Sequence, residues 1–296
     1  MLMQNKKGFL ALFLNSICLG TYGIWVKLLQ NTFSAYQQVA IRSIIAFLFS
    51  VMLALILKSN WKFHKKHQKH FAFYLFSFVV STILFTVGVT QTTIAISIFD
   101  FYIGSILSAF LIGLFFFGEA LSVRKICSVV FILLALCILS YPHLFMLFAP
   151  GFLASIGSGI FDGIGNGFKK YFGGKIERPV LIVYQIGATL LITLVLLLFA
   201  RQPLLPTHAS FLHLSMLFIY GIIFLAVAYL SMYGFQHFNL NLGTIVISLE
   251  LFWAPVFAFF VFSQTLTVTQ LIGGVFIGAA IVTPYIKLQK IFLYRS

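Results

Sequence analysis

Acidic residues are scarce in this chain: only 5 of its 296 residues are aspartate or glutamate, against 19 lysines and arginines. Charged residues of both signs make up only 8% of the sequence, whereas 61% of it is hydrophobic. Since roughly a quarter of the residues in an average soluble domain are charged, this composition excludes a soluble globular domain. We therefore expect a membrane protein.

Cysteine is nearly absent as well. Cys18, Cys127 and Cys137 all fall in apolar segments and show no metal-ligand spacing, so we expect them to fill apolar space. The sequence also lacks a nucleotide-binding loop of the form Gly-x-x-x-x-Gly-Lys-Ser/Thr. We expect neither a cofactor nor a metal ion, and no ATP-driven pumping by this chain alone.

Long apolar segments take up most of the sequence. Each of ten segments is close to the ~20 residues that span the core of a bilayer. They cover residues 8–27, 36–57, 71–92, 95–117, 122–141, 151–169, 180–200, 211–235, 242–262 and 268–286. The connections between them are short and leave no room for a soluble domain. The sequence predicts an all-α, polytopic membrane protein with ten transmembrane helices.

The basic residues are distributed unevenly between the connections. If the N-terminus is cytoplasmic, nearly all of them fall on the cytoplasmic side, while the other side holds only Lys27 and Arg201. This bias predicts that both termini are cytoplasmic. The first segment follows Lys6-Lys7 and lacks a convincing cleavage site, so we expect a retained signal-anchor helix. The positive charge then indicates contact with anionic lipids and not with nucleic acid.

The two halves of the chain match each other at a nearly constant spacing. At 143 residues, Gly8-Phe9-Leu10-Ala11 falls on Gly151-Phe152-Leu153-Ala154, Arg42 on Gln185 and Lys58 on Arg201; from the third segment on the spacing is 145, which pairs Gln91 with Gln236. We interpret the match as two repeats, residues 1–145 and 146–296. Each repeat has five segments, an odd number, so the second crosses the membrane in the opposite sense. Inverted repeats of this kind build transporters whose site near the midplane opens alternately to each side.

Several short motifs accompany the repeats. They are Leu19-Gly20-Thr21-Tyr22 in the first segment, Arg42 in the second, Gly118-Glu119-Ala120-Leu121 after the fourth and Pro255 in the ninth. With these motifs the whole chain resembles the drug/metabolite transporter superfamily, specifically its ten-helix EamA-like members. Leu19 stands where the family often has tryptophan, Phe110 where it often has proline, and Ser263-Gln264 where it repeats Gly-Glu. The resemblance implies a carrier of small organic metabolites with a central cavity, in the inner (plasma) membrane of a bacterium.

Residues 151–170 are unusual for a membrane segment because they include six glycines and one acid. On a helix, Ser158, Asp162, Asn166 and Lys170 would form one polar stripe. We assign Lys169 and Lys170 to the basic cytoplasmic side, which leaves Ser158, Asp162 and Asn166 as substrate-binding candidates. The glycines predict either close approach of neighbouring backbones or a bend or break in the helix.

Other polar residues inside the segments are further candidates for the substrate site. Ionisable groups at such depth are rare and mark functional sites by default, and they are Arg42, Asp100 and Glu250. Arg42 and Asp100 lie at similar depths, so a mutual ion pair and substrate contact are both open. Glu250 and Trp253 share a helix face that could bind a cationic or aromatic solute, and we expect Pro255 to kink that helix.

Three more residues complete these expectations. Gln91 and Tyr22 are substrate-binding candidates because a buried amide or hydroxyl needs partners. Glu119 lies at the cytoplasmic edge, where we expect it to pair with a loop and not with substrate.

The favoured function is secondary transport of a small-molecule substrate, such as an amino acid or a nucleobase-like solute, by alternating access. The membrane acids could couple transport to protons, and solute exchange or uncoupled facilitation fits equally well. A channel or lipid scramblase is the alternative. An intramembrane enzyme is disfavoured because neither membrane aspartate has a Gly-x-Gly-Asp context and His-Glu-x-x-His is absent. We do not expect an enzyme.

Overall fold

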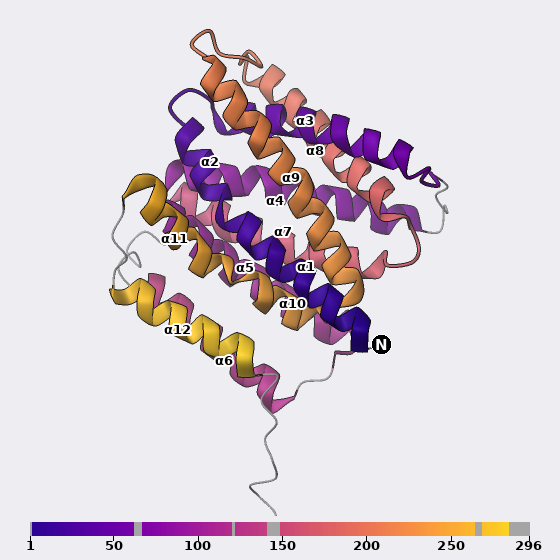
Figure 1. Cartoon of the computed structure of the whole chain (residues 1–296), viewed down its shortest axis with the longest axis vertical. Helices are drawn as coiled ribbons and strands as arrows, with labels where there is room; N and C mark the ends of the chain where they lie inside the picture. Colours follow the sequence, from indigo (N-terminus) through magenta and orange to yellow (C-terminus); the bar gives the residue numbers. More distant parts are fainter. Residues whose placement is uncertain (1, 62–66, 120–121, 141–148, 264–267, 284–296) are drawn as a thin grey trace, which may run out of the picture.

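The computed structural model describes residues 2–61, 67–119, 122–140, 149–263 and 268–283, and these residues form a bundle of helices without strands (Figure 1). The helices are α1 (Leu2–Gly20), α2 (Tyr22–Leu29), α3 (Ala35–Ile56), α4 (Gln68–Gln91), α5 (Ile94–Phe117), α6 (Val123–Ser140), α7 (Pro150–Tyr171), α8 (Arg178–Phe199), α9 (Phe211–His237), α10 (Leu240–Ile247), α11 (Glu250–Phe262) and α12 (Val268–Val282). The all-α prediction is confirmed.

The twelve helices of the described residues correspond to ten membrane segments, because two of the segments each consist of two helices. The first consists of α1 and α2, which meet at Thr21, and the ninth of α10 and α11, which meet at Ser248 and Leu249. Among the described residues, seven segments are long and apolar enough to cross a membrane: 6–29, 35–56, 68–91, 96–117, 178–199, 211–237 and 240–262. The shorter α6 and α12 and the glycine-rich α7 complete the ten. The predicted polytopic membrane protein is confirmed.

The ends of several helices match across the two halves. Lys58 and Arg201, 143 residues apart, both adopt the left-handed conformation, with φ of 49° and 51°. The amides of Lys58 and Arg201 donate to the carbonyls of Leu55 and Leu198, which are also 143 apart. Because this conformation is unfavourable for residues other than glycine, its recurrence at matched positions supports the repeat. The boundary at residues 145 and 146 lies outside the described residues, so that division stays a prediction.

The packing places α7 at the centre of the bundle. It lies against α5 and α4, while α1 packs on α9, and α3 packs on α8 and α9. Helices α6 and α12 lie side by side at one edge of the molecule, away from α3 and α8 (Figure 1). One face of α7 is therefore packed among other helices, while Leu153 and Ile160 of the same helix are exposed.

The glycines of α7 bring its backbone close to that of α5. A Cβ atom added at Gly159 would lie 1.8 Å from the carbonyl oxygen of Phe101, and one at Gly163 would lie 2.6 Å from that of Ser105. From the other side, a Cβ at Gly104 would lie 2.4 Å from the carbonyl oxygen of Ile156. Helix α7 itself is continuous from Pro150 to Tyr171. Of the two roles predicted for these glycines, close approach is therefore the one observed.

The ninth segment is interrupted at a different place from the one predicted. Pro255 lies inside α11, and the interruption falls at Ser248 and Leu249, nearly two turns earlier. The amides of Ser248 and Leu249 still bond to the carbonyls of Thr244 and Val246. The chain therefore changes from one helix to the next within two residues, directly before Glu250.

Candidate functional site

A cavity of about 100 Å³ lies between the helices of both halves. Four charged side chains line it: Arg42, Asp162, Lys169 and Glu250. Asp162 lies near the middle of α7, and Glu250 near the middle of the segment formed by α10 and α11. The rest of the wall includes four phenylalanines: Phe78, Phe85, Phe101 and Phe224. A small cavity with converging charged groups and an apolar wall is a typical solute site.

Arg42 is held in an aromatic box. One guanidinium nitrogen donates a hydrogen bond to the hydroxyl of Tyr220, and another donates to Oγ1 of Thr86 at 3.1 Å. The guanidinium carbon lies 4.6, 5.0 and 5.7 Å from the ring centres of Tyr220, Phe224 and Tyr22. Such distances allow cation–π attraction. These contacts fix the plane of the guanidinium at the cavity wall, with only 1% of the residue exposed.

Asp162, Asn166 and Lys169 form a connected chain of polar groups on α7. Oδ2 of Asp162 accepts hydrogen bonds from Ser105 and from the amide of Asn166, both at 2.8 Å. Oδ1 of Asn166 in turn accepts one from Nζ of Lys169 at 2.8 Å. Lys169 is only 4% exposed. Its assignment to the cytoplasmic surface was therefore wrong, because Asn166 and Asp162 draw its ammonium group inward.

Glu250 is the first residue of α11, directly after the interruption in the ninth segment. Its Oε2 accepts a hydrogen bond from the hydroxyl of Tyr102 at 2.6 Å, and the same hydroxyl contacts the carbonyl of Ile247 at 3.0 Å. Oε1 of Glu250 is buried and has no hydrogen-bond partner among the described residues. One oxygen of this carboxylate is thus left for a further donor.

Both interrupted segments contribute to the cavity next to their breaks. Tyr22 follows the break at Thr21, and Ile247 and Glu250 flank the break at Ser248 and Leu249. Interrupted helices near the midplane are a recurring way to build binding sites in transporters. The cavity therefore combines charged side chains with two places where the backbone departs from a regular helix.

The structure brings Tyr22, Arg42, Asp162, Asn166 and Glu250 together around this cavity. The other four predicted residues, Ser158, Gln91, Trp253 and Asp100, do not line it.

Each of those four has other surroundings. Ser158 is buried and donates to the carbonyl of Ser81 at 2.8 Å, which ties α7 to α4. Gln91 is the exposed last residue of α4. Trp253 packs against Phe13 of α1, at 6.3 Å between ring centres.

The proposed ion pair between Arg42 and Asp100 is not formed. In the described part of the chain the ion pair within 4.0 Å joins Lys170 to Glu119. Asp100 is buried, and its Oδ2 has no partner among the described residues. Similar depth therefore did not make Arg42 and Asp100 neighbours, because Arg42 is directed toward Tyr220 on α9.

A second polar contact mirrors the one made by Arg42. Gln185 is the repeat counterpart of Arg42, and its Oε1 accepts a hydrogen bond from the hydroxyl of Tyr74. Tyr74 and Tyr220 are 146 residues apart, close to the spacing of the repeat. This pair of tyrosines is the sequence signal that would have identified Tyr220 as the partner of Arg42. One contact joins α3 to α9, and the other joins α4 to α8.

Comparison with known proteins links the first half of the chain to a family. Residues 6–141 match the model of the EamA-like transporter family. This match covers most of the first predicted repeat. No curated protein matches the chain. One solved structure, described only as a crystal structure of a protein, aligns with a TM-score of 0.77 over 94% of this chain and 98% of its own, at 12% identity, which shows the fold alone.

The EamA-like family consists of membrane transporters of the drug/metabolite transporter superfamily, not of enzymes, and the resemblance drawn from the sequence is confirmed. Its Gly-Glu motif has a clear structural role here. Gly118 ends α5 in the left-handed conformation, with φ of 57°, and the next residue, Glu119, points back between the helices. Ser263, 145 residues later, ends α11 with φ of 52°. The same turn thus recurs although serine replaces glycine.

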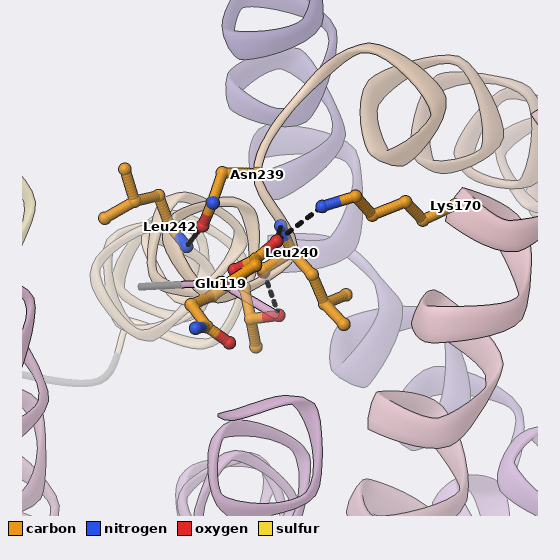
Figure 2. Close-up of polar contacts among 7 residues, drawn as sticks. Glu119, Lys170, Asn239, Leu240 and Leu242 are labelled. Carbon is orange, nitrogen blue, oxygen red and sulfur yellow. Dashed lines mark hydrogen bonds and ion pairs between the residues drawn. The ribbon is translucent and has the colours of Figure 1, made fainter. Parts of the chain in front are cut away.

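Glu119, which lies within the matched residues, contacts two parts of the other half, α7 and the start of α10 (Figure 2). Its Oε1 accepts hydrogen bonds from the amide of Leu240 at 2.8 Å and from Nζ of Lys170 at 2.5 Å, and its Oε2 accepts one from the amide of Asn241 at 3.2 Å. The side chain of Asn239 caps the next amide, that of Leu242, at 3.1 Å. The carboxylate therefore accepts hydrogen bonds from the first amides of α10. Its negative charge also interacts favourably with the positive end of the dipole of that helix. Glu119 lies outside the cavity, as expected from the sequence.

Proposed function

We propose that this transporter carries small organic solutes, amino acids or nucleobase-like compounds, by alternating access around the central cavity. The observation that supports this most is the meeting of four charged side chains from both halves in one buried cavity. Charged groups inside a membrane protein are costly and are retained where they act on a solute or an ion. We also propose that both termini lie in the cytoplasm, because the basic residues of the connections are biased toward that side, and that the protein lies in the inner membrane of a bacterium.

The mirrored contacts support a movement between two states. Arg42–Tyr220 joins α3 to α9, and Gln185–Tyr74 joins α8 to α4. Each contact connects one half with the other. In an alternating-access cycle, opening toward one side would separate one of these contacts while the other stays closed.

The first experiment identifies a solute and then measures its transport. Purified protein is screened by thermal melting against amino acids and nucleobases, since a ligand of the folded state raises its stability by mass action. The best ligand is then used in proteoliposomes, where we expect uptake that saturates with concentration. Uptake that rises linearly with concentration would indicate a channel, and movement of labelled lipid between leaflets without solute uptake would indicate a scramblase.

The same proteoliposomes distinguish the modes of coupling. With a proton gradient imposed across the membrane, coupled transport accumulates solute above the outside concentration. Uptake that ignores the gradient but is stimulated by unlabelled solute inside indicates exchange. Uptake that ignores both conditions indicates uncoupled facilitation.

A further inference from the structure

We infer that the cavity binds a zwitterion, with the anionic group of the solute on Arg42 and its cationic group on Glu250. The inference rests on the proposed transport function and narrows its substrate class. It excludes a neutral nucleobase-like solute as the preferred substrate.

Arg42 is a buried cation without an anion. Within ion-pair distance, 4.0 Å, the described residues offer it no carboxylate. Its guanidinium has five N–H donors, and its Nε has no partner among the described residues. A buried charge without a counter-charge is costly, and a carboxylate can accept two parallel hydrogen bonds from a guanidinium. Arg42 is therefore suited to a carboxylate of the solute.

Glu250 is a buried anion without a cation nearby among the described residues. It is 1% exposed, and no lysine, arginine or histidine of the described residues lies within ion-pair distance. Tyr102 donates to Oε2, while Oε1 has no partner. A hydroxyl donor alone does not neutralise a carboxylate. An ammonium group of the solute would supply both a positive charge and a donor for Oε1.

The other two charges of the cavity are already matched. Lys169 donates a hydrogen bond to Asn166, and Asn166 donates one to Asp162. The ammonium group of Lys169 and the carboxylate of Asp162 also attract each other electrostatically. Among the described residues, Arg42 and Glu250 are thus the two cavity charges without a hydrogen-bonded link to a group of opposite sign. Arg42 and Glu250 line the same cavity, together with Tyr22. A solute with one charge would leave either Arg42 or Glu250 uncompensated, whereas a zwitterion compensates both.

The size of the cavity favours a small zwitterion. The space open to the centres of water-sized spheres is about 100 Å³, and one water needs roughly 10–15 Å³ of such space. The cavity therefore has room for several waters or for one small solute. Phe78, Phe85 and Phe101 provide an apolar wall for that side chain.

The test uses the full-length protein and four compounds of nearly equal size. L-Alanine carries both charges, L-lactate only the negative one, L-alaninamide only the positive one, and lactamide neither. We expect L-alanine to raise the melting temperature at concentrations at least tenfold lower than the other three. Glycine and β-alanine extend the zwitterion series to a shorter and a longer solute.

Two variants assign the charges to residues. In Arg42→Gln, L-alanine should lose its advantage over L-alaninamide, while its advantage over L-lactate is retained. Glu250→Gln should show the reverse pattern. If a variant does not fold, Arg42→Lys or Glu250→Asp replaces it, and the comparison of the four compounds on the wild-type protein decides by itself.

The inference is overturned if L-lactate, L-alaninamide or lactamide binds the wild type as well as L-alanine, or if no zwitterion of the series binds. Saturable uptake of a neutral or singly charged solute would at the same time leave the proposed transport function intact. Absence of saturable uptake for every solute screened would instead overturn the proposed function.

Discussion

Replacing Gly159 by alanine is expected to lower the melting temperature of the purified protein by about 10 °C. The added Cβ would lie 1.8 Å from the carbonyl oxygen of Phe101 and 2.9 Å from the amide nitrogen of Ser105, both backbone atoms of α5. Backbone atoms cannot turn aside as a flexible side chain can, so α5 and α7 must separate. Overpacking of this kind costs about 3 kcal/mol, and each kcal/mol corresponds to roughly 2–4 °C.

Gly165→Ala is the matched control for this prediction. Gly165 lies on the same helix, and a Cβ there would have no atom within 4 Å. Because alanine is the better helix former by about 1 kcal/mol, the control should be unchanged or slightly more stable. Equal losses in the two variants, or no loss for Gly159→Ala, would contradict the close contact of α5 and α7. The measurement is thermal melting in detergent, with size-exclusion profiles to detect aggregation.

Glu119→Ala is expected to destabilise the protein by roughly 3 kcal/mol. The substitution removes the acceptor of two amides at the start of α10, those of Leu240 and Asn241, and the cost of a buried donor without a partner is about 1–3 kcal/mol. Lys170 also loses its counter-charge, but its side chain is 24% exposed, so water compensates for most of this loss. Unfolding monitored by tryptophan fluorescence in a denaturant series measures the change.

The controls for Glu119 separate its acceptor role from its charge. Glu119→Gln keeps one carbonyl oxygen and should recover part of the stability. Glu177→Ala removes an acid from the start of α8, where Glu177 is exposed and makes no capping hydrogen bond, so we expect little change. A loss for Glu177→Ala as large as that for Glu119→Ala would show that general charge, and not the contact with α10, is responsible.

The sequence was sufficient to predict the membrane segments but not their internal breaks. Each helix is a long apolar run, and length alone decides whether such a run can span a bilayer. The breaks at Thr21 and at Ser248 and Leu249 carry no proline, which is the usual signal. Pro255 carries that signal but lies within a continuous helix, since its neighbours tolerate the missing hydrogen bond.

The sequence predicted those site residues that are charged and lie deep in a membrane segment, because such residues are rare and usually functional. Arg42, Asp162 and Glu250 were identified because charges are uncommon at that depth, and all three line the cavity. Depth does not specify rotation about the helix axis, however, and successive residues turn by 100°. Ser158 lies on the same helical stripe as Asp162 but meets Ser81 of α4, and Asp100 lies outside the cavity lining.

Lys169 shows a further reason why the prediction was incomplete. A lysine in the last turn of a membrane helix usually extends toward the lipid headgroups. Here Asn166, one turn earlier, accepts its hydrogen bond and Asp162 attracts its charge, so the side chain stays inside. A partner on the same helix three residues away thus outweighed the general preference.

Solute counterflow with a blocked cavity tests the central claim, that this cavity is the substrate site of a carrier, most directly. Ala228 of α9 lines the cavity and is buried, so Ala228→Phe places an aromatic ring in that space. Ala72→Phe makes the same change at an exposed position of α4. With proteoliposomes loaded with the unlabelled solute, we predict transient accumulation of labelled solute for the wild type and Ala72→Phe, and at least a tenfold slower rate for Ala228→Phe that elutes as folded protein. Wild-type rates for a folded Ala228→Phe variant would contradict the assignment of the cavity.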